Sequence, residues 1–227
     1  MARKRASAVA GRLPRRFREV SFEREPVRSM NVALIREVRS YVRSIDERLS
    51  EGRGIWFVGG VGTGKTTLAM LISKAAMEAD RTVAIYSLPR LLAMLRDTFA
   101  DHSVFSLNEL IDRLCAVDLL HIDDVGAEQS SSWVLEQLYT IVNTRYEDGK
   151  ALLLTTNLDR GELEAQIGHR TVSRIYEICG GDPLPMWGDD HRLPAHTRAE
   201  APIAPEPDED AVWEGAAPSR YGRRPLD

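Results

Sequence analysis

The sequence has few cysteines and no long hydrophobic run. Its two cysteines, Cys115 and Cys179, lie 64 residues apart and outside any CxxC pair, which excludes a disulfide framework and a cysteine-based zinc site. We expect both to be buried, reduced thiols. The longest uncharged apolar run, residues 54–64, contains five glycines and is too short to cross a bilayer. Only Ala-Val-Ala follows the first basic residues, where a signal peptide would have a hydrophobic segment. We therefore expect a cytoplasmic protein with no membrane partner.

Lysine is also scarce. Only four of the 30 basic residues are lysines, and the others are arginines. Because arginine is so common in this chain, a single arginine carries little functional information. Residues 1–18 hold seven basic side chains and no acidic one, whereas residues 194–227 hold seven acidic and four basic residues and six of the eleven prolines. The remaining residues, 19–193, carry 19 basic and 27 acidic side chains, which does not favour non-specific coating of nucleic acid. Neither end can bury enough apolar surface to fold alone, and we expect both to be disordered.

The middle of the chain alternates predicted strands with predicted helices. Apolar residues at intervals of three and four predict helices over residues 30–49, 66–79 and 170–178. Short apolar runs predict strands over residues 55–58, 82–86, 117–122 and 151–155. Two capping boxes, Ser106 with Glu109 and Asp159 with Glu162, predict further helix starts. The alternation predicts an α/β fold in which a parallel sheet is sandwiched by helices, and 227 residues leave room for one such domain.

A glycine-rich loop between the first predicted strand and the next helix matches the P-loop pattern GxxxxGK[ST]. Its glycines allow backbone N–H groups to turn toward phosphate oxygens, and the helix N-terminus adds a favourable dipole. Lys65 supplies a positive charge for the β- and γ-phosphates, and the Thr66 hydroxyl is placed to coordinate Mg²⁺. The predicted nucleotide-binding residues are Gly59, Gly60, Val61, Gly62, Thr63, Gly64, Lys65, Thr66 and Thr67.

Polar residues also follow the third and fourth predicted strands. Asp123 and Asp124 come directly after residues 117–122, and Asn157 ends the Thr-Thr-Asn sequence, residues 155–157, at the end of the fourth predicted strand. Ligands of open parallel sheets gather at the carboxyl ends of the strands, so we expect these side chains beside the P-loop. Asp123 fits a ligand of the magnesium shell, Asp124 a base for the attacking water, and Asn157 an amide that positions this water. Because aspartate is one methylene shorter than the glutamate of many ATPases, we expect slow turnover.

The prediction of which nucleobase is bound, adenine or guanine, rests on a missing motif. Residues 123–126 match DxxG, a pattern that GTPases use to sense the γ-phosphate, but the chain lacks the guanine-reading NKxD. The nearest approach, residues 157–159, has no lysine. We therefore expect adenine, with ATP and Mg²⁺ as the cofactors.

The segments GGVGTGKTT, DLLHIDDVGAE, LLLTTN and GHRTVSRIYE, with the predicted helix that contains Trp133, together resemble the helicase-loader branch of the AAA+ ATPases, the DnaC/DnaI/IstB-like group. The resemblance covers roughly residues 52–180 and implies a P-loop NTPase with an AAA+ core and a truncated or absent C-terminal lid. It makes Lys65 and Thr66 the Walker A residues, the two aspartates Walker B, and Asn157 sensor 1. It also implies that Arg174, with Arg170 one turn before it, is an arginine finger that reaches the nucleotide of a neighbouring subunit. Such a role requires self-association.

The same resemblance implies single-stranded DNA and a replicative hexameric helicase as partners. Bacterial loaders of this kind carry a sizeable N-terminal helicase-binding domain, whereas only about 50 residues precede the first predicted strand here. We therefore divide the chain into a basic arm that could hold DNA phosphates, a linker with one helix, an ATPase core, and a mostly disordered tail rich in proline and acidic residues. These segments cover residues 1–18, 19–51, 52–181 and 182–227.

Three other functions remain open. An IstB-like transposition helper, which assembles on double-stranded DNA and recruits a transposase, would carry the same motifs. A P-loop small-molecule kinase would have a similar core, but the sequence has no recognisable substrate lid or acceptor-binding residues. A nucleotide-binding assembly module without meaningful turnover is suggested by Asp124 in the place of a glutamate.

Overall fold

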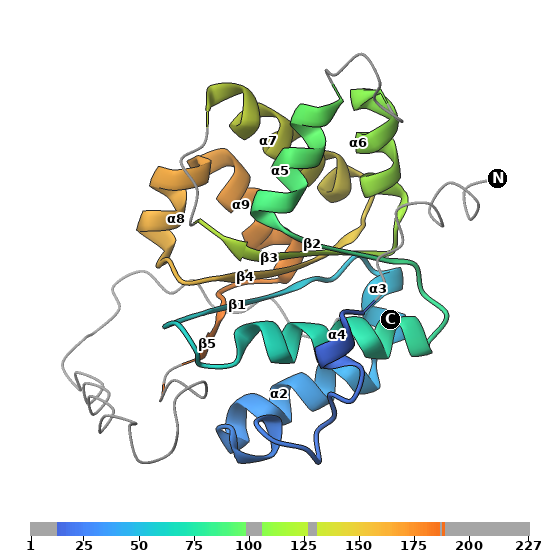
Figure 1. Cartoon of the computed structure of the whole chain (residues 1–227), viewed down its shortest axis with the longest axis vertical. Helices are drawn as coiled ribbons and strands as arrows, with labels where there is room; N and C mark the ends of the chain where they lie inside the picture. Colours follow the sequence, from blue (N-terminus) through green and yellow to red (C-terminus); the bar gives the residue numbers. More distant parts are fainter. Residues whose placement is uncertain (1–12, 99–105, 127–130, 187, 189–227) are drawn as a thin grey trace, which may run out of the picture.

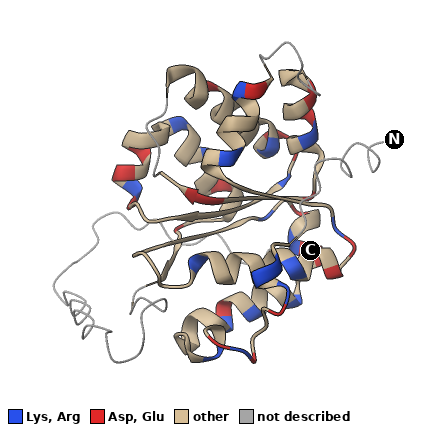
Figure 2. Cartoon of the chain, viewed as in Figure 1, with Lys and Arg blue, Asp and Glu red and all other residues tan. Residues whose placement is uncertain are grey.

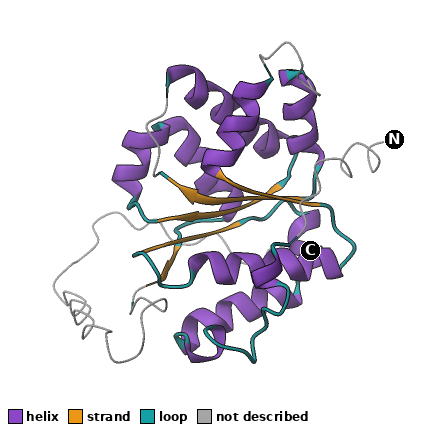
Figure 3. Ribbon diagram, in the orientation of Figure 1, coloured by secondary structure: helices purple, strands orange, loops and turns teal. Residues whose placement is uncertain are grey.

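A parallel sheet lies between two layers of helices in the computed structural model, which describes residues 13–98, 106–126, 131–186 and 188 (Figures 1 and 3). Helices α2, α3 and α4 cover one face of the sheet, and helices α5 to α9 cover the other. This arrangement confirms the predicted α/β fold class. It also places the carboxyl ends of all strands along one edge, toward the left of Figure 1.

The five strands lie in the order β2-β3-β4-β1-β5, and every neighbouring pair is parallel. They are β1 (Ile55–Gly59), β2 (Val83–Ser87), β3 (Leu119–Val125), β4 (Ala151–Thr156) and β5 (Leu184–Met186). The four predicted strands are all present, although β3 runs through both aspartates to Val125. β5 was not predicted, because its three residues include Pro185 and follow the last recognisable helix. Proline lacks an N–H and is tolerated only at such an edge position.

Strands β1 to β4 present alternate residues to the two helical layers. Trp56 and Leu120 pack in the core with helices α5, α6, α7 and α9, whereas Phe57 and Leu119 pack with α2, α3 and α4. A sheet that is buried on both faces gives continuous apolar runs in the sequence rather than an alternating pattern. For this reason the strands were recognisable as short hydrophobic runs between the helices.

The described helices include those predicted over residues 66–79 and 170–178, whose ends differ by one residue from the prediction. They are η1 (Arg15–Phe17), η2 (Val27–Ser29), α2 (Val32–Arg43), α3 (Ile45–Ser50), α4 (Lys65–Glu78), α5 (Leu88–Asp97), α6 (Leu107–Ala116), α7 (Ser132–Glu147), α8 (Arg160–Ile167) and α9 (His169–Cys179). Both predicted capping boxes are present, at the starts of α6 and α8. The helix expected over residues 30–49 is instead divided at Ser44, whose hydroxyl donates back to the Ser40 carbonyl. Such a bond competes with the regular helical ladder.

The two ends of the chain differ in part from the sequence expectation. Residues 15–17 form η1, and Phe17 is buried, so part of the segment 1–18 is folded against the body rather than disordered. β5 likewise extends the sheet beyond residue 181. The predictions for residues 1–12, for the tail from residue 189 and for the C-terminal lid lie outside the described residues.

The expectations about membrane spans and cysteines can be compared with the described residues. No helix among these residues is long and apolar enough to cross a membrane. Both cysteines are free thiols, with Cys115 buried and Cys179 partly buried. Burial raises the pKa of Cys115 to about 11, which keeps it protonated at neutral pH.

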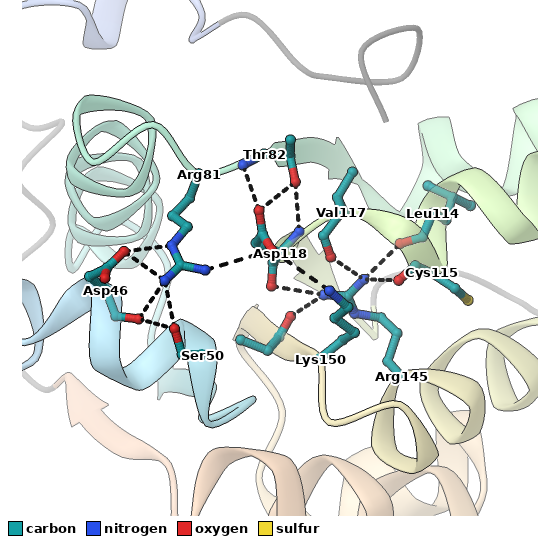
Figure 4. A network of polar contacts seen from close by, with 11 residues as sticks. Asp46, Ser50, Arg81, Thr82, Leu114, Cys115, Val117, Asp118, Arg145 and Lys150 are labelled. Atoms are coloured by element: carbon teal, nitrogen blue, oxygen red, sulfur yellow. Dashed lines mark hydrogen bonds and ion pairs between the residues drawn. The ribbon is translucent and has the colours of Figure 1, made fainter. Parts of the chain in front are cut away.

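A buried arginine holds together the amino ends of β3 and β4 (Figure 4). Arg145 of α7 has no exposed surface, and its guanidinium donates to the main-chain oxygens of Leu114 (2.7 Å), Val117 (3.1 Å) and Ala151. The last carbonyls of a helix have no partner within the helix, so the guanidinium supplies the donors that the end of α6 lacks. Burial lowers the pKa of Arg145 to about 10, and the side chain stays charged at neutral pH.

Asp118 extends this network to the other helical layer (Figure 4). Its carboxylate accepts hydrogen bonds from the Thr82 N–H (2.9 Å) and hydroxyl (2.7 Å), and Lys150 Nζ lies 3.7 Å away. Arg81 lies 3.9 Å from the same carboxylate and donates to Asp46 of α3 at 2.7 Å. The contacts connect α3 to the starts of β2 and β3, and we call this set around Arg145 and Asp118 the amino-edge network.

Candidate functional site

The P-loop joins β1 to α4 through glycines in conformations that other residues rarely adopt. Gly62 (φ +81°) and Gly64 (φ +93°) turn the chain toward the first residues of α4. A Cβ atom on Gly64 would collide with the Met30 side chain, and one on Gly59 would collide with the Met186 carbonyl of β5. The loop is therefore packed between the segment that precedes α2 and the edge strand β5.

The polar side chains of the loop are turned onto its own backbone. Lys65 is buried, and its Nζ donates to the carbonyls of Gly59 (2.8 Å) and Gly60 (2.6 Å). The Thr63 hydroxyl also donates to the Gly60 carbonyl, at 3.0 Å. A buried ammonium group at the N-terminus of a helix adds its charge to the helix dipole, which makes this loop a strong site for phosphate.

Thr66 and Asp123 meet between α4 and β3. The Thr66 hydroxyl lies 3.0 Å from Oδ1 and 3.2 Å from Oδ2 of Asp123 and donates to this carboxylate. Burial is the largest single influence on the pKa of Asp123 and raises it, but the His121 ring and the hydroxyls of Thr155 and Thr66 together bring it below its usual value. The carboxylate is therefore ionised at neutral pH.

This pair of oxygen ligands fits Mg²⁺. The ion is usually held by one or two protein oxygens together with substrate phosphates and water, rather than by a cage of protein ligands. Within the described residues there is no cluster of three His, Cys, Asp or Glu side chains that could hold a metal by itself. A cation beside the P-loop would neutralise charge on the phosphates.

Asp124 and Asn157 form the exposed side of the same edge. Asn157 Nδ2 donates to Asp124 Oδ1 at 3.3 Å, and both residues are exposed. Asp124 has a left-handed backbone conformation, with φ of +60°. The acidic end of β3 lies at the carboxyl edge of the sheet (Figure 2). A carboxylate paired with an amide can orient a water molecule, and that role stays a prediction for these two residues.

A pocket of about 300 Å³ adjoins the P-loop, and the N-terminal segment supplies one of its walls. It is lined by Gly62, Gly64, Lys65, Thr66 and Thr67 and also by Arg16, Phe17 and Pro26. The Arg16 guanidinium lies over the Phe17 ring, with 4.4 Å between Cζ and the ring centroid. Sequence reasoning missed these wall residues, since it placed Arg16 and Phe17 in the basic arm and no motif marks them.

Arg174 contacts α7 rather than the P-loop. Its Nε donates to Asn143 Oδ1 (3.3 Å), its Nη1 pairs with Glu177 (3.0 Å), and its Cζ lies 4.2 Å from the centroid of the Tyr146 ring. Arg170, one turn earlier on α9, is exposed and forms no hydrogen bond or ion pair with the residues that the structure describes. The structure does not bring either arginine into the pocket of its own chain, and the role in trans remains untested.

Comparison with known proteins assigns the chain to a family. A family model described as IstB-like ATP binding protein matches residues 15–175, which is well over half of the sequence. The chain belongs to this family of ATP-binding proteins. The matched residues include the pocket wall from Arg16, the P-loop and Asn157.

Curated relatives of the chain are replicative helicase loaders. The chain is 24% identical over 176 residues to the replicative helicase loader DnaI of Bacillus subtilis, and these residues cover 72% of this chain and 55% of DnaI. It is 27% identical over 139 residues to the replicative helicase loader DnaC of Escherichia coli, with 61% of this chain and 55% of DnaC covered. The chain spans about half the length of the curated relatives it matches.

Solved structures support the same assignment. The crystal structure of the DnaC helicase loader aligns with 26% identity and a TM-score of 0.63, over 76% of this chain and 99% of that chain. The replication initiator DnaA bound to AMPPCP and single-stranded DNA aligns with 24% identity and a TM-score of 0.63, over 79% of this chain and 52% of that chain. At this lower identity the second likeness shows the fold alone. Together these findings confirm the AAA+ P-loop fold and the DnaC/DnaI/IstB-like family predicted from the motifs.

Proposed function

We propose that this chain is a cytoplasmic, DnaC-like helicase loader that binds single-stranded DNA and a replicative hexameric helicase under the control of ATP binding and slow hydrolysis. The observation that carries the proposal is the alignment with the DnaC helicase loader over 99% of the solved chain, at an identity of 26%. The curated helicase loaders among its relatives support the same function. The P-loop pocket gives such a protein its site for ATP.

In this proposal the nine P-loop residues from Gly59 to Thr67 hold the phosphates, and Thr66 with Asp123 holds Mg²⁺. The ion would neutralise charge that develops on the transferred phosphoryl group. Asp124 and Asn157 orient the attacking water. Because the Asp124 side chain is one methylene shorter than a glutamate, its carboxylate lies farther from the attacking water than a glutamate carboxylate at this position would. This greater distance supports a slow reaction.

In this proposal the N-terminal wall of the pocket contacts the part of ATP that the P-loop does not hold. Arg16 is exposed and lies over Phe17, so a flat cationic surface borders the pocket. A guanidinium can stack on an aromatic base in the same way as it stacks on an aromatic side chain. We assign the adenine to this side of the pocket.

Self-association would complete the site. Arg174 is held by Asn143, Tyr146 and Glu177 on the α7–α9 face of the chain, so its guanidinium serves a nucleotide only if a second copy presents its carboxyl edge to this face. An arginine supplied from a neighbouring subunit stabilises negative charge in phosphoryl transfer. The expected hydrolysis therefore depends on assembly.

The test is ATP hydrolysis together with the mass by light scattering, with and without single-stranded DNA, for the native chain, Arg174→Ala and Glu177→Gln. Glu177→Gln removes the ion pair but keeps the guanidinium, and it controls for local effects on α9. We expect ATP and DNA to drive assembly, Arg174→Ala to bind ATP without hydrolysing it, and Glu177→Gln to hydrolyse at the native rate. A monomer in which Arg174→Ala hydrolyses normally would contradict the trans arginine finger, and phosphoryl transfer to a metabolite without DNA would favour the kinase.

The family model favours a second candidate, an IstB-like transposition helper. The two candidates differ in the DNA that they prefer, so affinity is measured by anisotropy for short single strands and for long duplexes in the presence of ATP. A loader binds the short single strand more tightly, whereas a helper prefers duplex and binds it more tightly as its length increases.

The basic arm is the proposed contact for DNA phosphates. Phe17 is part of the buried core, so deleting residues 1–18 would disturb the body as well. Replacing Arg3, Lys4 and Arg5 by Gln tests the arm without touching Phe17 or the Arg16 wall. We expect weaker DNA binding and a shallower dependence on salt, by about one unit of slope for each phosphate that the arm no longer neutralises. Unchanged affinity and slope would exclude these residues as the contact.

A further inference from the structure

The pairing of β3 with β4 is irregular at the two aspartates of β3. β3 and β4 pair residue for residue from Leu119 with Ala151 to Ile122 with Leu154, and the pairing resumes at Val125 with Thr156. Two residues of β3, Asp123 and Asp124, therefore face a single residue of β4, Thr155. This is the arrangement of a β-bulge, which re-aims side chains and leaves backbone groups without a partner in the ladder.

The Thr155 hydroxyl is bonded on both sides to the bulge. It accepts a hydrogen bond from the Asp124 N–H at 2.8 Å and donates one to Asp123 Oδ1 at 2.7 Å. The direction of both bonds is fixed, because an N–H can only donate and an ionised carboxylate can only accept. Thr155 is 1% exposed, so water does not compete for these positions.

Each of the two bonds acts on a different aspartate. The first holds the backbone of Asp124 at a φ of +60°, a conformation that costs a non-glycine residue free energy and needs support from its surroundings. In this conformation the Asp124 carboxylate lies 3.3 Å from Asn157 Nδ2. The second bond restrains the rotation of the Asp123 carboxylate.

The other donors near Asp123 do not replace Thr155. Thr66 also donates to this carboxylate, but it is itself the proposed magnesium ligand on α4. His121 Nε2 lies 3.9 Å from Asp123 Oδ1, beyond hydrogen-bond distance, while its Nδ1 lies 3.0 Å from the Ser73 hydroxyl. Thr155 is thus the donor that holds the Asp123 carboxylate from the side of β4.

We propose that Thr155 is a positioning residue that sets the geometry of both aspartates through one hydroxyl group, and so couples the proposed magnesium ligand to the proposed water-orienting residue. The inference rests on the proposed ATP site. It adds a residue that the P-loop, strand-end and Asn157 motifs leave unassigned. Metal-ligating carboxylates commonly need such hydrogen-bonded partners, whose loss weakens metal binding or activity.

The neighbouring threonine provides a matched control. Thr156 is also fully buried, and its hydroxyl donates to the Val125 carbonyl of β3 at 2.6 Å. It therefore bonds to the same strand at the same bulge, but to a main-chain carbonyl in place of a carboxylate. Comparing Thr155→Val with Thr156→Val separates the positioning of the aspartates from a general loosening of β3 against β4. Thr155→Ser restores the hydroxyl, and Thr155→Ala covers the case in which valine does not fit.

The first measurement is amide hydrogen exchange at Asp124 in the nucleotide-free protein. Thr155→Val removes the acceptor of this N–H, and we expect exchange at least about tenfold faster than in the native chain or in Thr155→Ser. An exchange rate at Asp124 in Thr155→Val equal to that of the native chain overturns the proposal. If the valine variant does not fold, the same result in Thr155→Ala overturns it. This measurement needs no nucleotide, so it stands even if the chain does not hydrolyse ATP.

The second measurement is the binding of a fluorescent ATP analogue, titrated with Mg²⁺. We expect Thr155→Val to need about tenfold more Mg²⁺ to reach half of the Mg²⁺-dependent increase in binding of the analogue. Its affinity for the analogue without Mg²⁺ should be unchanged, and Thr155→Ser should restore the native midpoint of the Mg²⁺ titration. Thr156→Val should leave the midpoint near the native value. An equal shift in both valine variants means a structural role only and overturns the proposal, whereas failure of the native chain to bind the analogue overturns the proposed function.

Discussion

Both edges of the parallel sheet carry charged and polar side chains. At the amino edge these groups are bonded within the chain, whereas at the carboxyl edge some of them are exposed. At the amino edge, Arg145 donates to several main-chain carbonyls and Asp118 is enclosed by Thr82, Lys150 and Arg81. At the carboxyl edge, Asp124 and Asn157 are exposed, and the P-loop lines a pocket of about 300 Å³. The first edge is closed by contacts within the chain, and the second has room for a ligand.

The backbone of the two edges differs in the regularity of the strand pairing. An aspartate in the left-handed conformation occurs at both edges, Asp80 (φ +59°) before β2 and Asp124 (φ +60°) in β3. Among the described strands, the pairing shifts register only at the carboxyl edge, opposite Thr155. Such a bulge re-aims side chains and is common next to active sites. We infer that the amino-edge network contributes stability and the carboxyl edge contributes function, so substitutions at the two edges should affect different measurements.

The largest expected effect is that of Arg145→Met on stability. This change removes the guanidinium that donates to the carbonyls of Leu114, Val117 and Ala151 in the interior, and we expect the free energy of unfolding to fall by about 3 kcal/mol or more. Urea denaturation measures it, with Arg160→Met on the exposed face of α8 as the control, for which we expect a change within about 0.5 kcal/mol. Similar losses in the two variants would show that the network is not the source of stability.

The next effect is a dependence of stability on pH at Asp118. Burial raises the pKa of this carboxyl and is the largest single influence, but the Thr82 hydrogen bonds with Lys150 and Arg81 together hold the pKa below its usual value. Since the pKa is lower in the folded chain than in the unfolded one, the carboxylate stabilises the fold above roughly pH 4, and this contribution is lost as the pH falls through the folded-state value.

Asp118→Asn tests this dependence. We expect the variant to be less stable at pH 7 by about 1 kcal/mol and to approach the native stability as the pH falls below roughly 4. Urea denaturation across this pH range checks it, and both chains should keep the acid sensitivity that comes from Asp123, whose pKa is also lowered. A constant difference between the two chains at every pH would contradict the assignment.

The smallest effect is expected at the N-terminal wall of the pocket. Arg16→Ala removes the guanidinium beside the proposed adenine site, and we expect ATP affinity to fall by about two- to fivefold. Arg15→Ala is the matched control, because Arg15 is also exposed but does not line the pocket. Isothermal titration of both variants measures the difference, and equal affinities would remove Arg16 from the site.

Much of the carboxyl edge was predictable from sequence because motifs record local chemistry. The P-loop, the paired aspartates and Asn157 each follow a strand that is recognisable as an apolar run, and the structure brings them together at one edge. The α/β fold follows from the same alternation of strands and helices. Ser106 and Asp159 mark helix starts because their side chains bond to the first turn of the helix.

The remainder depends on contacts between distant residues. Arg145 looks like any other arginine in an arginine-rich sequence, and only the folded chain shows that it lies among carbonyls 28 to 31 residues before it. Thr155 lies two residues before Asn157, but its contacts with the two aspartates depend on a bulge that no spacing reveals. β5 is too short for a periodic signal, and Phe17 is one aromatic residue in a basic segment.

Thermal unfolding with and without MgATP tests the division between the two edges most directly, in the native chain, Lys65→Ala and Asp118→Asn. A ligand that binds only the folded state raises the unfolding temperature, so we expect MgATP to raise it in the native chain. Asp118→Asn should unfold at a lower temperature but show the same rise, whereas Lys65→Ala should show none. A full rise in Lys65→Ala, or its loss in Asp118→Asn, would contradict the account.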